Sequence, residues 1–351
     1  MKKSSLSLKL YSLLLVAILI LLTGCNSEPE NENIGKARAE ASNDRLSIPK
    51  SKDIIIAMVP KSLDNPVFLD AKEEAERTGK ELGIKVEWLG SMQTDLKEQE
   101  EIIESLIRRQ VDGIIVSCID PGRMRNVINK AVSAGIKVAT FDSDSPSSDR
   151  IFYCGTNNYA AGEACGKALV KALKDKKSER KSLNLLIMTA DEDSYNLNER
   201  LRSFKDTVLK NGISFGEINT LYCRDDINLA GDLLEKYIQK NPDTDVFFST
   251  GGWPLIVPIE SMPGFQAWCK SGGTSIVIDT FYPIVDAARK GMADALVGQD
   301  FKKMGELSIR TLYKAIKGEG ISMKFIDTGL ELGDKNNYEK LLQSKKQWEI
   351  K

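Results

Sequence analysis

Residues 54–59 read Ile-Ile-Ile-Ala-Met-Val, and residues 67–82 follow with apolar positions at helical spacing that stop at Gly83. A short apolar run rich in β-branched residues is typical of a strand buried on both faces, as in parallel sheets. A glycine directly after a helical pattern is a common helix end, because glycine adopts the left-handed backbone easily. The stretch therefore predicts a strand followed by a helix, the first unit of an α/β fold.

The same alternation continues along the chain in two series. The predicted strands of the first series are 84–89, 113–118 and 136–141, with helices at 96–109 and 124–134. The second series has strands at 184–189, 218–222, 246–250, 275–279, 293–297 and 325–330, and helices ending at 209 or spanning 229–239 and 304–316. Crossovers between parallel strands are almost always right-handed, so each series predicts an open parallel sheet with helices on both sides. About 300 residues exceed the usual size of one core, which favours two Rossmann-like lobes.

The N-terminal 25 residues are typical of an export signal. Lys2 and Lys3 precede an apolar run at 13–22, which is half of the ~20 residues that span a bilayer but suits a secretory signal. The following Leu22-Thr23-Gly24-Cys25 resembles the lipobox of bacterial lipoproteins, which implies cleavage after residue 24 and acylation of Cys25. A plain signal peptide or a short signal anchor is the alternative. Residues 25–51 have few large apolar side chains and are predicted to be a flexible tether.

Composition excludes several classes of protein. The chain has 49 basic and 50 acidic side chains, so no strong electrostatic attraction to nucleic acid is expected. It has no histidine. The absence of histidine excludes Ser-His and Cys-His catalysis and every His-ligated metal site. We expect no cofactor and no metal.

Polar or aromatic residues follow nearly every predicted strand. They stand at 61–68, 142–144, 155–162, 191–200, 225–228, 250–253, 279–281 and 297–300. Ligands of open α/β sheets bind beyond the carboxyl ends of the strands. Carboxylates, amides and guanidinium groups pair with vicinal hydroxyls, and an aromatic ring offers a wall for the C–H face of a sugar. The pattern predicts a site for a small polyhydroxylated ligand.

Four blocks in order along the chain carry a family resemblance. They are Ala57–Val59 with Leu63–Phe68, Val111–Val116, Gly135–Asp142, and Asn198–Arg200 with Phe204. These blocks resemble the ribose- and galactose-type periplasmic binding proteins, the solute-binding components of sugar ABC transporters. The resemblance implies the type 1 fold of that family, with two lobes joined by a three-strand hinge near 154–157, 298–301 and 326–329. The implied lobes are 52–155 plus 300–326, and 156–299 plus 327–351.

The resemblance also implies the residues that contact ligand. They are Asn65, Phe68, Asp142, Asn158, Arg200, Asp279 and Gln299, with Asp142 as a bidentate acceptor for hydroxyls. Three positions depart from the family pattern: Ser143 replaces an arginine, Gly251 an asparagine and Asp225 an aromatic residue. We therefore expect Trp253 or Phe281 to supply the stacking surface, and the ribose pattern cannot be assumed.

Each of these residues also has a structural interpretation. Asn65 before Pro66 could cap a helix, and Asp142 and Asp279 could cap the segments that follow them. Arg200 could pair with Glu199 at the surface. Trp253 could pack within its lobe instead of touching ligand.

Cysteines and acidic pairs suggest weaker alternatives. Besides Cys25 the chain has Cys118, Cys154, Cys165, Cys223 and Cys269, whose spacing does not determine a pairing. We expect buried thiols, and a Cys223–Cys269 bridge is the first pair to test. The pairs Asp191/Asp193 and Asp225/Asp226 could serve a glycosidase, but adjacent loop carboxylates more often cap helices, and we predict no enzymatic activity.

The predicted function is that of a monomeric solute-binding lipoprotein. It is expected on the extracytoplasmic side of a membrane, held there by a lipid anchor, where it captures a monosaccharide or polyol between two lobes and delivers it to an ABC permease. The same fold could instead report ligand to a membrane sensor kinase or chemoreceptor. A regulator of the lac-repressor type is disfavoured, because an export signal stands where a DNA-binding motif would be. The identity of the sugar, its ring form and anomer, and the Gram type of the envelope stay open.

Overall fold

A computed structural model describes residues 54–345 of the chain. The predicted signal peptide at 1–24, the tether at 25–51 and the acylated Cys25 lie outside the described residues. Among residues 54–345, none of the helices combines the length and the apolar character that a membrane crossing requires.

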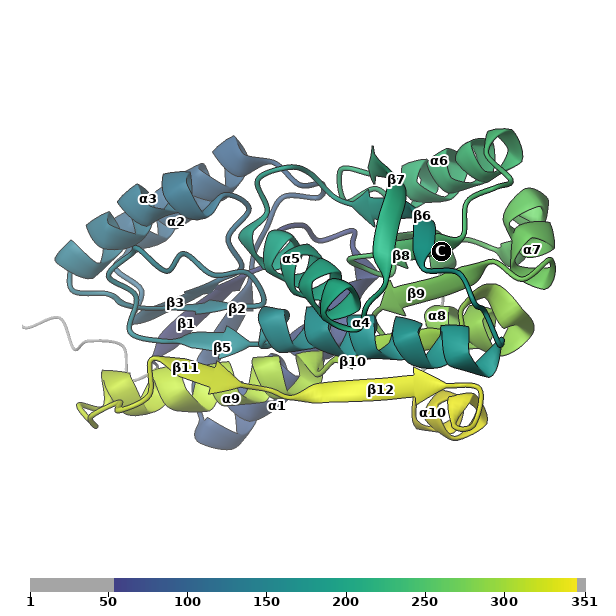
Figure 1. Cartoon of the computed structure of the whole chain (residues 1–351). Helices are drawn as coiled ribbons and strands as arrows, with labels where there is room; N and C mark the ends of the chain where they lie inside the picture. Colours follow the sequence, from purple (N-terminus) through teal and green to yellow (C-terminus); the bar gives the residue numbers. More distant parts are fainter. Residues whose placement is uncertain (1–53, 346–351) are drawn as a thin grey trace, which may run out of the picture. The chain divides into compact units, whose positions relative to one another are not determined.

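The first sheet has six strands in the order β11-β5-β4-β3-β1-β2, and all of its strand pairs are parallel (Figure 1). Its strands are β1 Ile55–Val59, β2 Lys85–Trp88, β3 Gly113–Val116, β4 Lys137–Phe141, β5 Tyr153–Gly155 and β11 Phe325–Asp327. The helices that accompany it are α1 Leu69–Leu82, α2 Leu96–Arg109, α3 Pro121–Ser133 and α9 Phe301–Ile316, with a 3-10 turn η1 at Pro66–Phe68. Helix α1 packs on α9, and α2 packs on α3. The predicted βαβ series is therefore present, with helices on both faces of the sheet.

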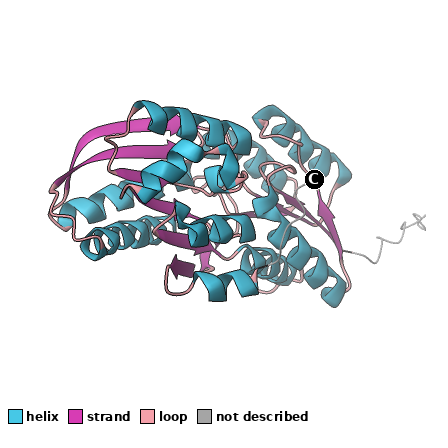
Figure 2. Ribbon diagram, turned by 90° about the vertical axis from the view of Figure 1, so that its right-hand side faces the viewer, coloured by secondary structure: helices cyan, strands magenta, loops and turns pink. Residues whose placement is uncertain are grey.

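The second sheet also has six strands, in the order β12-β10-β9-β8-β6-β7. Its strands are β6 Ser182–Thr189, β7 Ser214–Tyr222, β8 Val246–Ser249, β9 Thr274–Ile278, β10 Ala295–Gln299 and β12 Leu330–Asp334. Only β12 runs antiparallel, beside β10. The helices are α4 Asn158–Asp175, α5 Tyr195–Lys210, α6 Ile227–Lys240, α7 Pro263–Lys270, α8 Tyr282–Ala287 and α10 Tyr338–Ser344. Two 3-10 turns, η2 Trp253–Leu255 and η3 Ile259–Ser261, and a π-helical segment, η4 Ala288–Met292, accompany them. Helices again lie on both sides of the strands (Figure 2), which confirms the α/β class with two mostly parallel sheets.

The chain passes between the two sheets three times. The passages lie between β5 and α4, between β10 and α9, and between β11 and β12. Each passage begins where β5, β10 or β11 ends, so all three connections lie next to the carboxyl ends of strands.

The predicted strand at 325–330 is wrong, because it is two strands of different sheets. Strand β11 ends at Asp327 and β12 begins at Leu330. Between them Gly329 has φ +80°, and its N–H donates to Oδ1 of Asp327 at 2.9 Å. Glycine supplies this left-handed turn at little cost. Apolar residues stand on both sides of the turn, Phe325 and Ile326 before it and Leu330 and Leu332 after it, so the pattern concealed the break.

Helix α4 is missing from the predicted elements, although it is the longest helix among the described residues. Asn157 caps it by accepting a hydrogen bond from the N–H of Ala160 at 3.0 Å. Within α4, a Cβ added to Gly162 would stand 2.1 Å from the carbonyl oxygen of Arg200. The glycine therefore permits a close approach between α4 and the helix that carries Arg200.

The five described cysteines are free thiols, so the suggested Cys223–Cys269 bridge is wrong and the expectation of unpaired thiols is confirmed. All are buried except Cys269, which is partly buried. Burial raises the pKa of Cys154, Cys223 and Cys269 to about 12. Thiols with such pKa values are poor nucleophiles at neutral pH.

Candidate functional site

A narrow cavity of about 40 Å³ lies beside the carboxyl ends of strands from both sheets. It is lined by Lys61, Asn65, Val67, Phe68, Asp142, Asn196, Leu197, Arg200, Asp225, Gly251, Trp253, Asp279, Gln299 and Phe301. A volume of this size holds only a few water molecules. A molecule as large as a sugar ring therefore enters only if the walls move apart.

Asp142 is held firmly at the end of β4. Its Oδ2 accepts a hydrogen bond from the hydroxyl of Ser117 at 2.6 Å, and its carbonyl oxygen accepts one from the hydroxyl of Tyr153 at 2.8 Å. Its backbone is left-handed, with φ +55°. Such a conformation is uncommon outside glycine and often marks a functional site. Since Oδ1 has no hydrogen-bond partner among the described residues, it is available to a ligand.

Asn65 and Phe68 line the same side of the cavity. The side chain of Asn65 accepts from the N–H of Val67 at 3.2 Å, so it does cap the turn η1, as the structural interpretation proposed. Its amide nitrogen remains for a ligand. Phe68 packs edge-on against Phe141 and Phe301, with ring centroids 6.1 and 5.8 Å away. The ring is thereby fixed as an apolar wall.

Arg200 lies on the opposite side and is only 2% exposed. Its Nε donates to Oδ1 of Asn158 and its Nη1 to the carbonyl oxygen of Thr250, both at 2.8 Å, and its Nη2 donates to Oε1 of Gln299. The alternative of a surface pair with Glu199 is wrong. Glu199 pairs with Arg202 instead, at 2.8 Å.

Asp279 is anchored by two donors at the end of β9. Its Oδ1 accepts from the amide of Gln299 at 2.8 Å, and its Oδ2 accepts from the N–H of Gly252 at 3.0 Å. Burial raises the pKa of Asp279, while the nearby Arg200 lowers it. Its φ of +90° adds a second strained position in the cavity wall.

Trp253 lines the cavity and also makes a specific contact. Its indole N–H donates to Oδ1 of Asp225 at 2.6 Å. Burial raises the pKa of Asp225, while Lys61 and the indole N–H lower it. Phe281, the other stacking residue considered, does not line the cavity but packs beside Phe301.

The structure brings every predicted ligand residue to the cavity wall except Asn158, which lies behind Arg200 and positions it. The polar segments that follow predicted strands at 61–68, 191–200 and 225–228 contain Lys61, Asn196 and Asp225, but none of the three was singled out as a ligand contact. Phe301 lies one residue beyond the segment 297–300 and was missed. Asn196 lies in the first turn of α5, and its Oδ1 is buried without a hydrogen-bond partner in the described structure.

Other carboxylates in the suggested acidic pairs serve local structure. Asp191 accepts from the N–H groups of Asp193 and Ser194 at 2.9 and 2.7 Å. Asp226 caps α6 through the N–H of Leu229. Within residues 54–345, no group of three or more acidic or cysteine side chains is placed to hold a metal ion.

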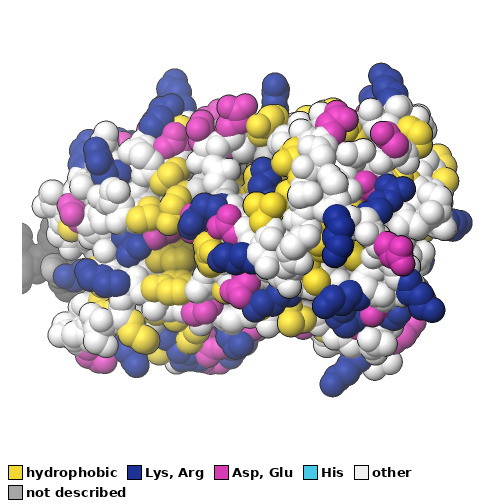
Figure 3. Space-filling view, in the orientation of Figure 1, with side chains coloured by type: hydrophobic (Ala, Val, Ile, Leu, Met, Phe, Trp, Pro, Cys, Tyr) yellow, Lys and Arg dark blue, Asp and Glu magenta, His cyan; other side chains and the backbone are white. Residues whose placement is uncertain are grey.

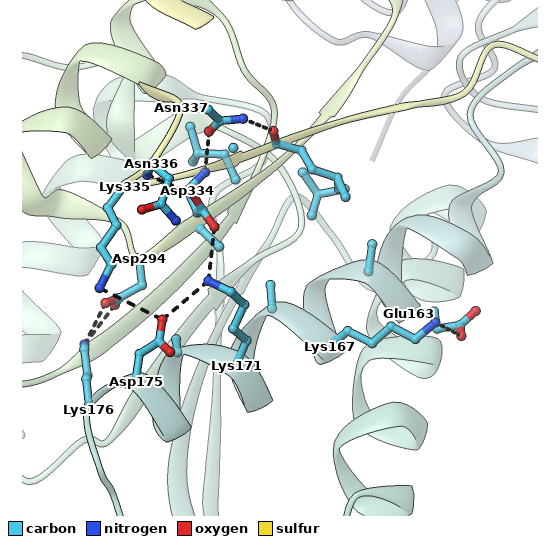
Figure 4. Close-up of a pocket in the computed structure, with 18 of the residues that line it drawn as sticks. Glu163, Lys167, Lys171, Asp175, Lys176, Asp294, Asp334, Lys335, Asn336 and Asn337 are labelled. Carbon is cyan, nitrogen blue, oxygen red and sulfur yellow. Dashed lines mark hydrogen bonds and ion pairs between the residues drawn. The ribbon is translucent and has the colours of Figure 1, made fainter. Parts of the chain in front are cut away.

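A larger groove of about 840 Å³ lies within the second lobe, between α4 and the strands β10 and β12 (Figure 4). Its charged rim is paired internally: Lys167 with Glu163 at 2.6 Å, Lys171 with Asp334 at 3.1 Å and Lys176 with Asp294 at 2.9 Å. These pairs leave few polar groups for a ligand. On the face in Figure 3, basic and acidic side chains are interspersed, so this face lacks the continuous basic stripe typical of nucleic-acid binding.

Three comparisons place the chain among known proteins. A family model described as a periplasmic binding protein domain matches residues 56–320. The ribose import binding protein of Bacillus subtilis is 27% identical over 155 residues, which cover 44% of this chain and 47% of that protein. The ribose import binding protein of Haemophilus influenzae is 22% identical over 285 residues, which cover 80% of this chain and 91% of that protein.

A solved structure is similar over nearly its whole length. It is an ABC transporter solute binding protein from Burkholderia graminis, in complex with D-arabinose. It superimposes with a TM-score of 0.75 at 30% identity and covers 82% of this chain and 96% of that one.

Proposed function

The chain belongs to the periplasmic binding protein family, and from this membership we propose that it captures a monosaccharide or related polyol between its two lobes and delivers it to an ABC importer. Sugar binding of the ribose or arabinose type, in an extracytoplasmic family, follows from the relatives. Proteins of this family are binding proteins rather than enzymes, and we propose that the sugar leaves chemically unchanged.

One observation carries the proposal: hydrogen-bonding side chains from both sheets face a single cavity. Asp142 follows β4 of the first sheet, whereas Arg200 and Asp279 belong to the second lobe. A carboxylate accepts from sugar hydroxyls and a guanidinium donates to ring or hydroxyl oxygens. Phe68 adds an apolar wall for the C–H face of the ring. A monosaccharide offers this combination of groups in one small molecule.

We propose that the three passages between the sheets act as a hinge, with lobes of 52–155 plus 300–326 and 156–299 plus 327–351. Gln299 stands at one passage, where its Oε1 accepts from the hydroxyl of Thr156 at 3.1 Å and from Arg200. Thr156 stands at another passage. A ligand that contacts both walls stabilises the closed arrangement relative to the open one, and closure can then report occupancy to a membrane partner.

We further propose that Cys25 is acylated after removal of residues 1–24, so that the monomeric protein stays on the outer side of a membrane. Two acyl chains or more give stable anchoring, at about 0.8 kcal/mol per buried methylene. A labelled fatty acid should be incorporated by the wild-type protein and not by Cys25→Ser. Label in both proteins, or in neither, contradicts the anchor. Permease genes beside this one support import, whereas a sensor-kinase gene alone supports the signalling alternative.

The binding proposal is tested by thermal shift and calorimetry with purified protein. The panel contains D-ribose, D-arabinose, D-allose, D-galactose, D-glucose and D-xylose, with D-gluconate as an acidic comparison. Saturation at a hundred times Kd stabilises the native state by about 2.7 kcal/mol. We expect at least one neutral sugar to raise the melting temperature and to be recovered intact after incubation. A panel without any shift, or release of a modified sugar, contradicts the proposal.

A further inference from the structure

Lys61 is a buried cation that lines the cavity without a partner. It follows β1, is 7% exposed, and its Nζ makes no hydrogen bond or ion pair with the described residues. Burial of an unpaired ammonium group is costly. The three N–H donors of Lys61 can therefore find acceptors on a ligand.

Asp225 enters the same cavity from the second lobe. Trp253 occupies its Oδ1 at 2.6 Å, and Oδ2 accepts no hydrogen bond from the described residues. The residue sits in a strained loop, because Arg224 and Asp225 are both left-handed, with φ +54° and +62°. A carboxylate held in this way, with one oxygen fixed and one open, is oriented for a hydroxyl donor.

Lys61 and Asp225 line one cavity from different lobes. No ion pair within 4.0 Å joins them, although Lys61 lowers the pKa of Asp225. A ligand group that lies between them in the cavity can accept from the ammonium and donate to the carboxylate.

A hydroxyl is a neutral group that does both, and a monosaccharide carries several. An acidic ligand group is disfavoured, because three carboxylates, Asp142, Asp225 and Asp279, face the cavity against the two cations Lys61 and Arg200. We propose that Lys61 and Asp225 form a specificity subsite that binds one hydroxyl of the sugar from both lobes at once. This inference rests on the proposed function and deepens it: the ligand is a neutral sugar with a hydroxyl at this subsite, and the corresponding deoxysugar is rejected.

The test uses the D-sugar of the panel that binds most tightly to the wild-type protein, together with its complete set of monodeoxy analogues. A site built to hydrogen-bond a hydroxyl rejects the analogue that lacks it. Calorimetry should show at least tenfold weaker binding for one analogue or more. Lys61→Met and Asp225→Asn should each weaken binding of the parent sugar about tenfold or more. For at least one of the analogues that bind the wild type weakly, the ratio of its Kd to the Kd of the parent sugar should fall below three in both variants.

Matched controls are the exposed residues Lys97 and Asp232. Lys97→Met and Asp232→Asn should bind the sugar as the wild type does. Circular dichroism and melting of the unliganded variants show whether each is folded, and both site variants should melt no lower than the wild type.

The outcomes separate this inference from the proposed function. If Asp142→Asn abolishes binding while Lys61→Met and Asp225→Asn retain the wild-type affinity and deoxy preference, the subsite is refuted and sugar binding stands. If the wild-type protein binds no sugar of the panel, both proposals fail. Tight binding of D-gluconate that is lost on Lys61→Met would also overturn the subsite, because Lys61 would then bind an anion.

Discussion

The Nε of Arg200 donates to Oδ1 of Asn158 at 2.8 Å, which joins the buried guanidinium on α5 to the first turn of α4. With Thr250 and Gln299 holding the other two nitrogens, the arginine is fixed before any ligand arrives. An arginine has five N–H donors, so two remain for other acceptors. Preorganisation of this kind reduces the entropy lost on binding.

Asn158→Ala should weaken sugar binding about tenfold without any direct contact to the sugar, because it releases Nε and lets the guanidinium shift. Loss of one partner from a buried hydrogen bond also costs about 1–3 kcal/mol of stability. Asp95→Ala is the control: it removes the cap of α2, away from the cavity, and costs about 1 kcal/mol. Calorimetry should find normal affinity for Asp95→Ala, and equal losses in both variants would contradict the positioning role.

Asp142 can be tested without damage to the fold by Asp142→Asn. Asparagine keeps an acceptor for the Ser117 hydroxyl and tolerates the left-handed backbone. The unliganded melting temperature should change by about 2 °C or less, corresponding to roughly 0.5 kcal/mol, while the shift induced by sugar disappears. Asp142→Ala instead leaves the buried Ser117 hydroxyl without its acceptor, which costs about 1–3 kcal/mol. A full sugar shift in the asparagine variant would show that Asp142 is structural.

Asp225→Asn should make the unliganded protein more stable at neutral pH. The folded-state pKa of Asp225 is raised, mainly by burial, so its ionisation costs stability. That cost is present above the raised pKa and disappears as the pH falls towards the usual aspartate value of about 3.9. The melting temperature of the variant should exceed that of the wild type at pH 7.5, by roughly 2–4 °C per kcal/mol, and the gap should narrow as the pH is lowered towards 4. A gap that widens at acidic pH has the wrong sign for this explanation.

Gly162→Ala should disturb the site through the backbone. The new Cβ would stand 2.1 Å from the carbonyl oxygen of Arg200, so α4 and α5 must separate. Overpacking of this kind typically costs about 1–3 kcal/mol, and sugar affinity should fall with it. Gly320→Ala has no neighbouring atom within 4 Å of its added Cβ and is the control. Unchanged denaturation midpoints in both variants would show that the helices adjust freely.

Local patterns predicted most of the first lobe. Helix α2 has the predicted bounds 96–109, because its ends carry their own signals: Asp95 caps the first turn through the N–H of Glu98, and Gln110 ends the helix in a left-handed conformation. The break between β11 and β12 was not visible, since it depends on which sheet each half joins. Pairing between strands distant in sequence is decided by tertiary packing, which a local pattern does not contain.

Several residues of the candidate site were predictable from the sequence, but their hydrogen-bond and ion-pair partners were not. The position of polar residues after predicted strands and the family resemblance together indicated Asp142, Asp279 and Gln299. These three residues lie together in the cavity wall. Neither could show that Lys61 is buried without a partner, or that Asp225 is held by an indole at the place where the family has an aromatic ring. Such relationships depend on the tertiary arrangement of residues distant in sequence, which neither source of prediction contains.

The most direct test of sugar capture between the lobes is a crystal structure of the protein with the monosaccharide that binds most tightly. We predict one sugar ring in the cavity, with one hydroxyl within hydrogen-bond distance of Asp142 and another oxygen within that distance of Arg200 or Asp279. A sugar that touches one lobe only, or that occupies the groove between α4 and β12, would contradict capture between the lobes.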